Sequence, residues 1–479
     1  MQEKEQWSSR FGFIMAAVGM AVGTGNIWRF PRVAGTNGGG SFLIAYLIAN
    51  ITWVAPLIIT EIAVGKRTGM GTIGTFKRFA GEKNTWQGLW IGFVCTAITF
   101  YYVIVLAWAL RYLVYAVSGT FTHIQDTEAL WNSFIHNPVQ GVLFQILALI
   151  PVGFILYRGV NRGLERAGKF MIPLLFACLI YAAFWALSKE GAVQGLKYLF
   201  VPSWQGLKNP ATWLNAYTQA AWSSGAGWGM MLTYANYMKK NEDITVNGLL
   251  ITASDIAGAL ISALVVLPAV FAFSATEAAA FDALKQGNVG LTFVYLTKLF
   301  GTIQGGALVS SLFFIALSLS ALTSLLPQME VIVKNAIDFG VSRKKAVIFI
   351  IIGCFIFGVP SAVNIDFFNN QDWVWGIGLL ICGLFYAISV YRFGIKKFRT
   401  KLINPTSDVK LGGWYDICIS VYPFFLAVII VWWFIQSVQW SKNWFTPFAV
   451  DNPGTVIVQC ILTIGVCILL NKTVNKKIL

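Results

Sequence analysis

Charged residues and histidines are scarce in this chain of 479 residues. Asp, Glu, Lys and Arg together make up 11% of it, against about 25% in typical soluble domains. The only histidines, His123 and His136, fall in one segment between apolar stretches, and no metal-ligating or nucleophile motif accompanies them. The scarcity of charge excludes an ordinary soluble domain. The lack of such motifs argues against a membrane enzyme, because no catalytic groups are recognisable.

The cysteines show no spacing typical of a disulfide framework or a metal site. All seven lie in or beside apolar segments, where cysteine behaves as a small buried apolar residue. They are Cys95, Cys178, Cys354, Cys382, Cys418, Cys460 and Cys467. We therefore expect them to pack rather than to react.

Apolar residues, in contrast, make up 57% of the chain, and its mean hydropathy is +0.67. The 19 Trp and 37 Phe residues are typical of proteins whose aromatic rings lie at membrane interfaces. Apolar stretches of about 20 residues predict membrane-spanning helices. We expect twelve, at about 11–34, 41–65, 88–117, 140–157, 170–188, 211–238, 245–274, 305–335, 345–362, 373–391, 414–437 and 453–471.

The net charge of +15 raises the question of nucleic acid as a partner. The basic residues, however, cluster in segments that these spans place on one side of a membrane. Examples are Lys66, Arg67, Lys77 and Arg78; Arg158, Arg162, Arg166 and Lys169; and Arg343, Lys344 and Lys345. This is the bias of cytoplasmic loops, and it predicts a multi-pass protein of the cell membrane with both termini in the cytoplasm and no nucleic-acid partner.

Glycines interrupt the first apolar stretch halfway along its length. Gly19, Gly23 and Gly25 occur there, and the polar Asn26 follows at once. An unpaired amide in hydrocarbon costs several kcal/mol, so a helix broken at mid-membrane must line a protected cavity. A second glycine-broken stretch, QAAWSSGAGWG, occupies 219–229 in the sixth predicted span. Two breaks in corresponding positions predict an inverted-repeat transporter with a site near the membrane midplane.

Three further motifs carry a family resemblance. GNIWRFP (Gly25–Pro31), NGGGSF (Asn37–Phe42) and SALTSLLPQME (Ser320–Glu330) resemble the helix signatures of the neurotransmitter:sodium symporters, of the bacterial amino-acid transporter type. The resemblance implies an all-α polytopic membrane protein of the LeuT type, with unwound first and sixth helices. It also implies sodium-driven transport by alternating access rather than an enzymatic activity.

The same resemblance divides the chain into five parts. It implies a cytoplasmic tail at 1–10, a first repeat of five helices at 11–188, an outer loop at 189–210, a second repeat at 211–391 with an outer lid loop at 275–304, and two peripheral helices with a cytoplasmic tail at 392–479.

Sodium is the cofactor that the resemblance implies, at two sites built from carbonyls, hydroxyls and amides. The first site takes Ala21, Asn26, Ser223 and Asp255. The second takes Gly19, Val22, Ser320, Thr323 and Ser324. A helical Ser or Thr can instead bond a carbonyl of its own helix, which is the alternative role of the hydroxyls.

Asp255 is an acidic residue inside the seventh predicted span, where a charge is costly and functional by default. Many relatives have Asn there, and some of them depend on chloride to balance charge. Asp255 would supply the negative charge itself, so we expect chloride independence. The alternative is an aspartate at a helix end in contact with water, with Ser254 at the matching position.

The substrate site follows from the same breaks. The resemblance and the positive end of a half-helix predict a carboxylate held by the amides of Thr24 and Gly25 and by the Tyr102 hydroxyl. Monoamine-carrying relatives have an aspartate where this chain has Gly23. We therefore expect an amino acid as the small-molecule substrate. It should be a neutral one, because no charged residue is among the other expected pocket residues, which are Met20, Ala21, Ile98, Trp222, Ser223, Gly225, Trp228, Ser324 and Gln328.

Charged residues on either side of the site are candidate gates. Arg29 and Asp372 are expected to pair outside, and Lys4, beside Trp7, is expected to pair inside with Asp338 near Tyr237. Glu61 is expected to be a structural partner of the unwound first helix.

Two alternatives remain open at the level of sequence. The protein transports another small carboxylated or amine solute with sodium, or it is a channel, which would need an open pore and a selectivity filter. The lipid bilayer is the other expected partner, and the oligomeric state is left open.

Overall fold

The described part of the chain, residues 5–440 and 443–478 of a computed structural model, is helical and contains no strand. Ten helices in it are long and apolar enough to cross a membrane. They are Gly40–Thr68 (α3, η2 and α4), Glu82–Val117 (η3 and α6), Pro138–Tyr157 (α8), Val160–Leu187 (η5 and α9), Thr245–Phe273 (α14), Gly306–Asp338 (α18), Arg343–Val363 (α19), Ile365–Phe393 (α20), Gly413–Trp440 (α22) and Pro453–Lys477 (α23).

The first predicted span is broken, as expected. It consists of α1 (Arg10–Ala21), then η1 (Gly25–Arg29) and α2 (Phe30–Thr36), and the two halves meet at an angle of 43°. Val22 is the last residue whose amide bonds within α1, and its backbone then leaves the helical region, with φ −92° and ψ 69°. The residues between Ala21 and Gly25 therefore have backbone groups outside the α-helical ladder.

The sixth predicted span is also broken. It comprises α12 (Pro210–Ser223) and the short α13 (Met230–Ala235). Between them, Gly225, Gly227 and Gly229 have φ values of 70°, 91° and 81°. Residues with a Cβ rarely adopt such values, so the GAGWG sequence is what allows the chain to turn here. The ten helices and the first broken span account for eleven of the twelve predicted spans, and α12 with α13 occupies the place of the sixth.

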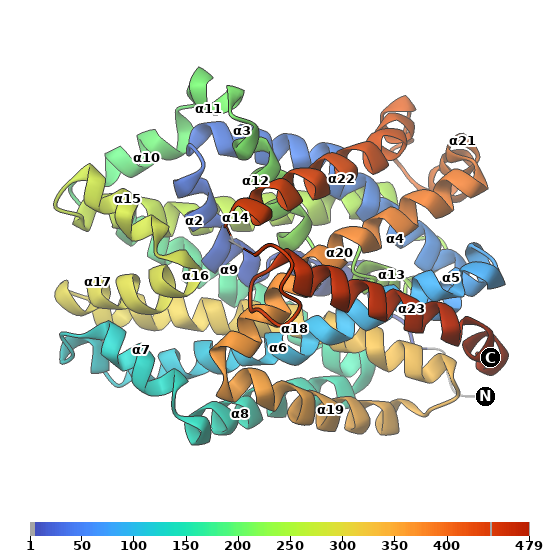
Figure 1. The fold of residues 1–479 in the computed structure, drawn as a ribbon, viewed down its shortest axis with the longest axis horizontal. Helices are drawn as coiled ribbons and strands as arrows, with labels where there is room; N and C mark the ends of the chain where they lie inside the picture. Colours follow the sequence, from blue (N-terminus) through green and yellow to red (C-terminus); the bar gives the residue numbers. More distant parts are fainter. Residues whose placement is uncertain (1–4, 441–442, 479) are drawn as a thin grey trace.

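The long helices lie roughly parallel along the long axis of the molecule, and both termini lie at the same end (Figure 1). At the opposite end are short helices, among them α7, α10, α15 and α17 (Figure 1). The predicted lid loop is helical, with α15 (Glu277–Lys285), α16 (Gly287–Val289), η6 (Gly290–Tyr295) and α17 (Leu296–Thr302). The remaining elements are α5 (Thr72–Phe79), η4 (Thr120–Thr122), α7 (Thr127–Ile135), α10 (Ala192–Phe200), α11 (Trp204–Lys208), α21 (Ile395–Phe398), η7 (Arg399–Ile403) and η8 (Asn404–Thr406).

The centre of the molecule is formed by α6 and α18, which pack along each other and against the broken spans. Glycines permit the close approach of α1 to α18. A Cβ placed on Gly19 would lie 3.0 Å from Cβ of Thr323. The two breaks are thus held beside the middle of α6 and α18, inside the bundle and away from lipid.

Candidate functional site

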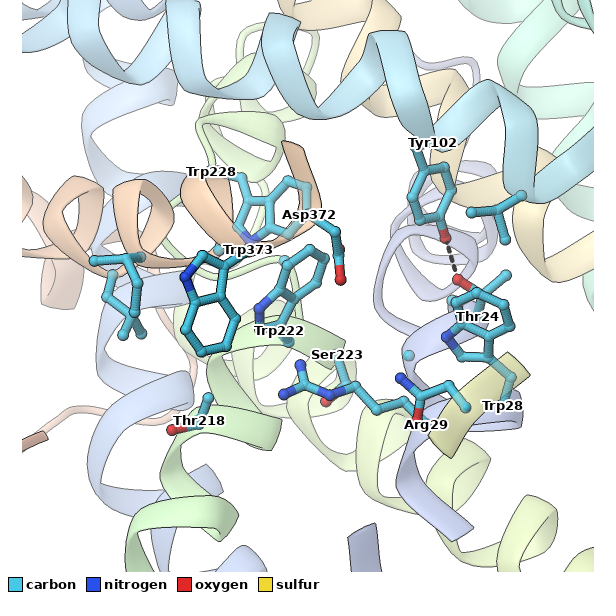
Figure 2. Close-up of a pocket in the computed structure, with 18 of the residues that line it drawn as sticks. Thr24, Trp28, Arg29, Tyr102, Thr218, Trp222, Ser223, Trp228, Asp372 and Trp373 are labelled. Atoms are coloured by element: carbon cyan, nitrogen blue, oxygen red, sulfur yellow. Dashed lines mark hydrogen bonds between the residues drawn. The ribbon is translucent and has the colours of Figure 1, made fainter. Parts of the chain in front are cut away.

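A cavity of about 580 Å³ lies between the two breaks. Its walls come from the α1 and α12 breaks, α6, α18, α20 and the end of α22. Figure 2 shows Thr24 and Tyr102 on one side of this cavity and Trp222, Trp228 and Trp373 on the other. The cavity is therefore bounded by a polar break on one side and by indole rings on the other.

The polar side is held by hydrogen bonds across the first break. The hydroxyls of Thr24 and Tyr102 lie 2.6 Å apart (Figure 2). Gln219 of α12 donates from Nε2 to the carbonyl of Gly25 at 2.8 Å, which joins the two broken spans directly. Sequence reasoning did not single out Gln219, although it opens the second glycine-broken stretch.

Eleven of the residues predicted for the substrate pocket line this cavity. They are Met20, Gly23, Thr24, Gly25, Tyr102, Trp222, Ser223, Gly225, Trp228, Ser324 and Gln328. Ala21 and Ile98, which were expected there, are fully buried elsewhere and do not line it. Ala21 follows Met20 in the chain, and Ile98 lies one helical turn before Tyr102. Both side chains point into the packed interior rather than into the cavity.

Two of the residues predicted for the first sodium site, Asn26 and Ser223, meet a third, Asp255, which is fully buried. Its Oδ1 accepts a hydrogen bond from Asn26 Nδ2 at 2.9 Å, and its Oδ2 accepts from Ser223 Oγ at 3.3 Å. Tyr46 donates to the same Oδ2 at 2.6 Å. Asp255 is therefore no water-exposed helix end. Sequence reasoning missed Tyr46, because a tyrosine in an apolar span carries no signal of its partner.

Asn26 has one polar atom left over in this cluster. Its Nδ2 is used by the Asp255 carbonyl and carboxylate, but its Oδ1 is buried and has no hydrogen-bond partner among the described residues. An unsatisfied buried oxygen costs about 1–3 kcal/mol. A carboxylate, a hydroxyl and a spare amide oxygen are a donor set that suits a hard cation such as sodium.

The second predicted sodium site lies where α1 meets α18. The Ser324 hydroxyl is so close to the first break that a Cβ on Gly23 would lie 2.4 Å from it. The Oγ atoms of Ser320 and Ser324 are buried without a hydrogen-bond partner in the described chain. Thr323, however, donates to the Ser320 carbonyl at 3.1 Å, the local role that was its alternative. Gly19 lies in the last turn of α1 beside Thr323, and Val22 is the residue that caps this helix.

The predicted outer gate residues both line the cavity without pairing. Among the ion pairs of the described residues, none joins Arg29 to Asp372. Asp372 accepts a hydrogen bond from the Tyr101 hydroxyl at 3.1 Å, and the Arg29 guanidinium lies 5.5 Å from the Trp222 ring centroid. The cavity continues past them to Trp440 at the end of α22, so it is open toward the end opposite the termini.

The end that carries the termini is closed. Trp7 is buried and donates from Nε1 to the Tyr234 carbonyl at 2.9 Å. The Tyr237 hydroxyl donates to Glu330 Oε1 at 2.5 Å. Arg343 forms ion pairs with Glu330 and Glu5, each at 2.6 Å. Burial raises the pKa of the Glu5 carboxyl, while the neighbouring Arg343 acts to lower it.

Of the predicted inner pair, Lys4 and Asp338, the structure describes only Asp338. Lys4 lies outside the described residues, so its pairing stays a prediction. Asp338 forms an ion pair with Lys334 at 2.7 Å and accepts from the Gly71 amide at 2.6 Å. The acid that bonds Tyr237 is Glu330 instead, two helical turns earlier on α18. Glu330 ends the motif that begins at Ser320, but its partner Arg343 lies on another helix.

Glu61 also differs from its expected role. Its carboxylate accepts hydrogen bonds from the amides of Gly227 and Leu232, the latter at 3.1 Å. It therefore stabilises the sixth span at its break, and the expectation of a partnership with the first unwound helix was wrong. The reason is that α4 packs against α13, a tertiary contact that the sequence does not reveal.

A helical membrane protein with two facing breaks, a central cavity open at one end and an inner end closed by a polar network belongs to the class of secondary transporters. The model of the sodium:neurotransmitter symporter family matches residues 4–140 and 135–476. The chain belongs to this family, which makes it a sodium-dependent transporter, a multi-pass membrane protein and not an enzyme.

Relatives and a solved structure agree with this assignment. The chain is 32% identical to an uncharacterized sodium-dependent transporter of Methanocaldococcus jannaschii, over 89% of this chain and 90% of the relative. It is also 32% identical to the uncharacterized sodium-dependent transporter YhdH of Bacillus subtilis, over 90% and 97%. The crystal structure of MhsT in complex with L-phenylalanine matches with a TM-score of 0.79 and 30% identity, over 89% of this chain and 99% of MhsT. The predicted family and LeuT-type fold are confirmed.

Proposed function

We propose that this protein is a chloride-independent symporter that uses a sodium gradient to carry neutral amino acids across the cell membrane, with both termini in the cytoplasm. The observation that carries the proposal is the buried cluster at the first break. Asp255 has only hydrogen-bond donors around its carboxylate in the described contacts, and Asn26 keeps an unused oxygen beside it.

Asp255 is the basis for chloride independence. A buried carboxylate is tolerated only if it is paired or coordinates a cation. Sodium at the first site, held by the Ala21 carbonyl, Asn26, Ser223 and Asp255, would be balanced by this carboxylate. No second anion is then needed for charge balance.

The second sodium would lie between α1 and α18. Its ligands would be the carbonyls of Gly19, Val22 and Ser320 with the hydroxyls of Thr323 and Ser324. The unpartnered, buried Ser324 hydroxyl supports this site, because a sodium ion would satisfy it. Both ions would tie the first break to a neighbouring helix and so favour the substrate-bound form.

The proposed substrate class, neutral amino acids, rests on the polar and apolar groups that line the cavity near the breaks. Gly23 offers no side-chain anion to an amine, whereas the start of η1 and the Tyr102 hydroxyl suit a carboxylate. The part of the cavity around Met20, Trp228 and Met230 is apolar. Methionines adapt to ligands of different shape, so we infer that several apolar side chains are accepted. The L-phenylalanine bound by MhsT is consistent with this class.

Transport would proceed by alternating closure of the two ends. Arg29 and Asp372 face the open cavity and would pair once substrate and sodium are bound, which closes the outer end. The network of Tyr237, Glu330, Arg343 and Glu5 would then have to separate to release the substrate inside.

The test is uptake into proteoliposomes of purified protein, with phenylalanine, leucine and phenethylamine as probes. We expect saturable uptake of the two amino acids driven by an inward sodium gradient and none of phenethylamine, which lacks the carboxylate. Replacing sodium by choline should abolish uptake, and replacing chloride by gluconate should leave it unchanged. Uptake that persists in choline contradicts sodium coupling, and uptake of phenethylamine contradicts the substrate class.

A further inference from the structure

A second hollow lies on the outside of the bundle, between α8 and α19. These helices lie side by side along one edge of the molecule (Figure 1). The hollow has a volume of about 340 Å³ and is lined by Gly153, Phe154 and Tyr157 of α8 and by apolar residues of α19 from Val347 to Ile352. We call it the α8–α19 groove. It is separate from the transport cavity and faces the hydrocarbon that surrounds the protein.

Gly153 leaves open space in the floor of the groove, because it has no side chain. A Cβ added to it would lie 3.4 Å from the Ile351 side chain, so a larger residue would fill the space between the two helices. The rims are exposed, since Phe154 and Ile352 retain 58% and 50% of their accessible surface. An apolar hollow with exposed rims between two membrane-spanning helices offers a surface on which an acyl chain can lie.

Two cations lie at the end of the groove nearest the termini. Arg158, directly after α8, has its guanidinium 4.2 Å from the centroid of the Phe154 ring. Lys344, in the first turn of α19, has its Nζ 5.3 Å from the centroid of the Tyr157 ring. Both rings line the groove, so the two charges lie beside its end.

These cations are available for an outside partner. Within residues 5–440 and 443–478, no ion pair links Arg158 or Lys344 to an acidic residue. The neighbouring Glu5 pairs with Arg343 instead. Both side chains are exposed. Cations at the end of an apolar groove are the arrangement that recognises an anionic lipid headgroup.

We infer that the α8–α19 groove binds one anionic phospholipid, with its phosphate between Arg158 and Lys344 and an acyl chain along Gly153 and Ile351. Charge complementarity favours a lipid over a second protein copy, because a second copy would have to bring an acidic surface to this end of the groove within the membrane. Arg343 precedes Lys344 and belongs to the inner closing network, so a bound lipid would hold the start of α19 in the closed position.

The test is lipid retention by the intact protein, measured by native mass spectrometry after titration with POPG or POPC. We expect the wild type to retain one POPG much more tightly than POPC. In the double variant Arg158→Gln/Lys344→Gln, POPG binding should weaken about thirtyfold, since each basic residue near an anionic surface contributes roughly one factor of five. The control Lys396→Gln/Lys401→Gln removes the same charge at the same end and should retain POPG as the wild type does.

Filling the groove distinguishes a specific lipid site from non-specific electrostatic attraction of anionic lipid. Gly153→Leu leaves every charge in place and should weaken POPG retention at least tenfold. Gly153→Ala, whose methyl group would lie 3.4 Å from the Ile351 side chain and so narrow the groove, should weaken it by a smaller factor and is the variant to use if Gly153→Leu does not fold. Equal loss in the control variant would overturn the site in favour of general attraction. Unchanged binding in both Gly153 variants would overturn the groove, and loss of a dimer rather than of a lipid would assign the groove to a second copy. The readout is independent of transport, so it stands apart from the proposed function.

Discussion

The sixth-span break depends on Glu61, and the energy of that dependence can be worked out from its contacts. The Glu61 carboxylate is fully buried and accepts hydrogen bonds from the amides of Gly227 and Leu232. In Glu61→Ala these two donors lose their partner in a space without bulk water. A buried donor left unsatisfied costs about 1–3 kcal/mol, so the variant should lose about 2–6 kcal/mol of stability.

The expected shift in melting temperature follows from the length of the chain. The entropy of unfolding is roughly 2 cal/mol/K per residue, or about 1 kcal/mol/K for a chain of this size. Glu61→Ala should therefore melt about 2–6 °C lower than the wild type. Glu61→Gln keeps one acceptor oxygen but turns an amide NH₂ toward the second donor. Its melting temperature should therefore lie between those of the wild type and Glu61→Ala.

The cysteines provide the assay. All seven are free and buried, so a thiol-reactive fluorescent dye will report unfolding as they become exposed. Glu190→Ala is the control, because it removes an exposed carboxylate from the turn after α9. If Glu61→Ala melts within about 1 °C of the control, the carboxylate does not stabilise the break and the reasoning is refuted.

Two further predictions concern the first break. Gly23→Ala would place its Cβ 2.4 Å from Ser324 Oγ, and crowding of this kind costs about 1–3 kcal/mol, so sodium binding should weaken about 5- to 150-fold by isothermal titration. When Gly23→Ala is added to a Ser324→Ala variant, the further loss of sodium affinity should nearly vanish. The control Gly465→Ala, at a glycine with open space around it, should leave sodium affinity unchanged. If the effects of Gly23→Ala and Ser324→Ala simply add, the contact between the two positions is contradicted. Asp255→Asn removes the charge that receives bonds from Tyr46 and Asn26, and uptake in chloride-free buffer should fall at least about tenfold, with partial recovery when chloride is added. Wild-type uptake by this variant without chloride would show that Asp255 does not balance the sodium charge.

The broken spans were predictable because they depend on local chemistry. Glycines in an apolar stretch mark a backbone that leaves the helix, and the φ values of Gly225, Gly227 and Gly229 agree with that interpretation. The cavity residues at both breaks followed from the same motifs. Tyr46 and Gln219 could not be found in this way, because a hydrogen bond between distant residues leaves no trace in either local sequence.

The inner end shows the same limit. Trp7 and Tyr237 were expected there and do lie together, since the Trp7 amide donates to the Tyr237 carbonyl at 3.0 Å. The acid that accepts a hydrogen bond from Tyr237 is Glu330, whereas Asp338, the acid expected near Tyr237, bonds elsewhere; both acids lie on α18. Spacing along one helix cannot decide which of its faces meets another helix, and that choice selects the partner.

The sequence by itself determined the membrane class, nearly all of the spans and the position of both breaks. These depend on hydropathy and on glycine conformation, which are properties of short stretches of chain. The tertiary structure alone decided which buried polar groups meet, as with Asp255 and Tyr46, and which stay unsatisfied, as with Asn26 Oδ1. It also decided that Glu61 stabilises the sixth span and that the cavity is open at one end only. Such pairings depend on how helices far apart in the chain pack. In a buried apolar interior a polar group without a partner costs free energy, so the packing decides which groups are left to bind an ion or a substrate.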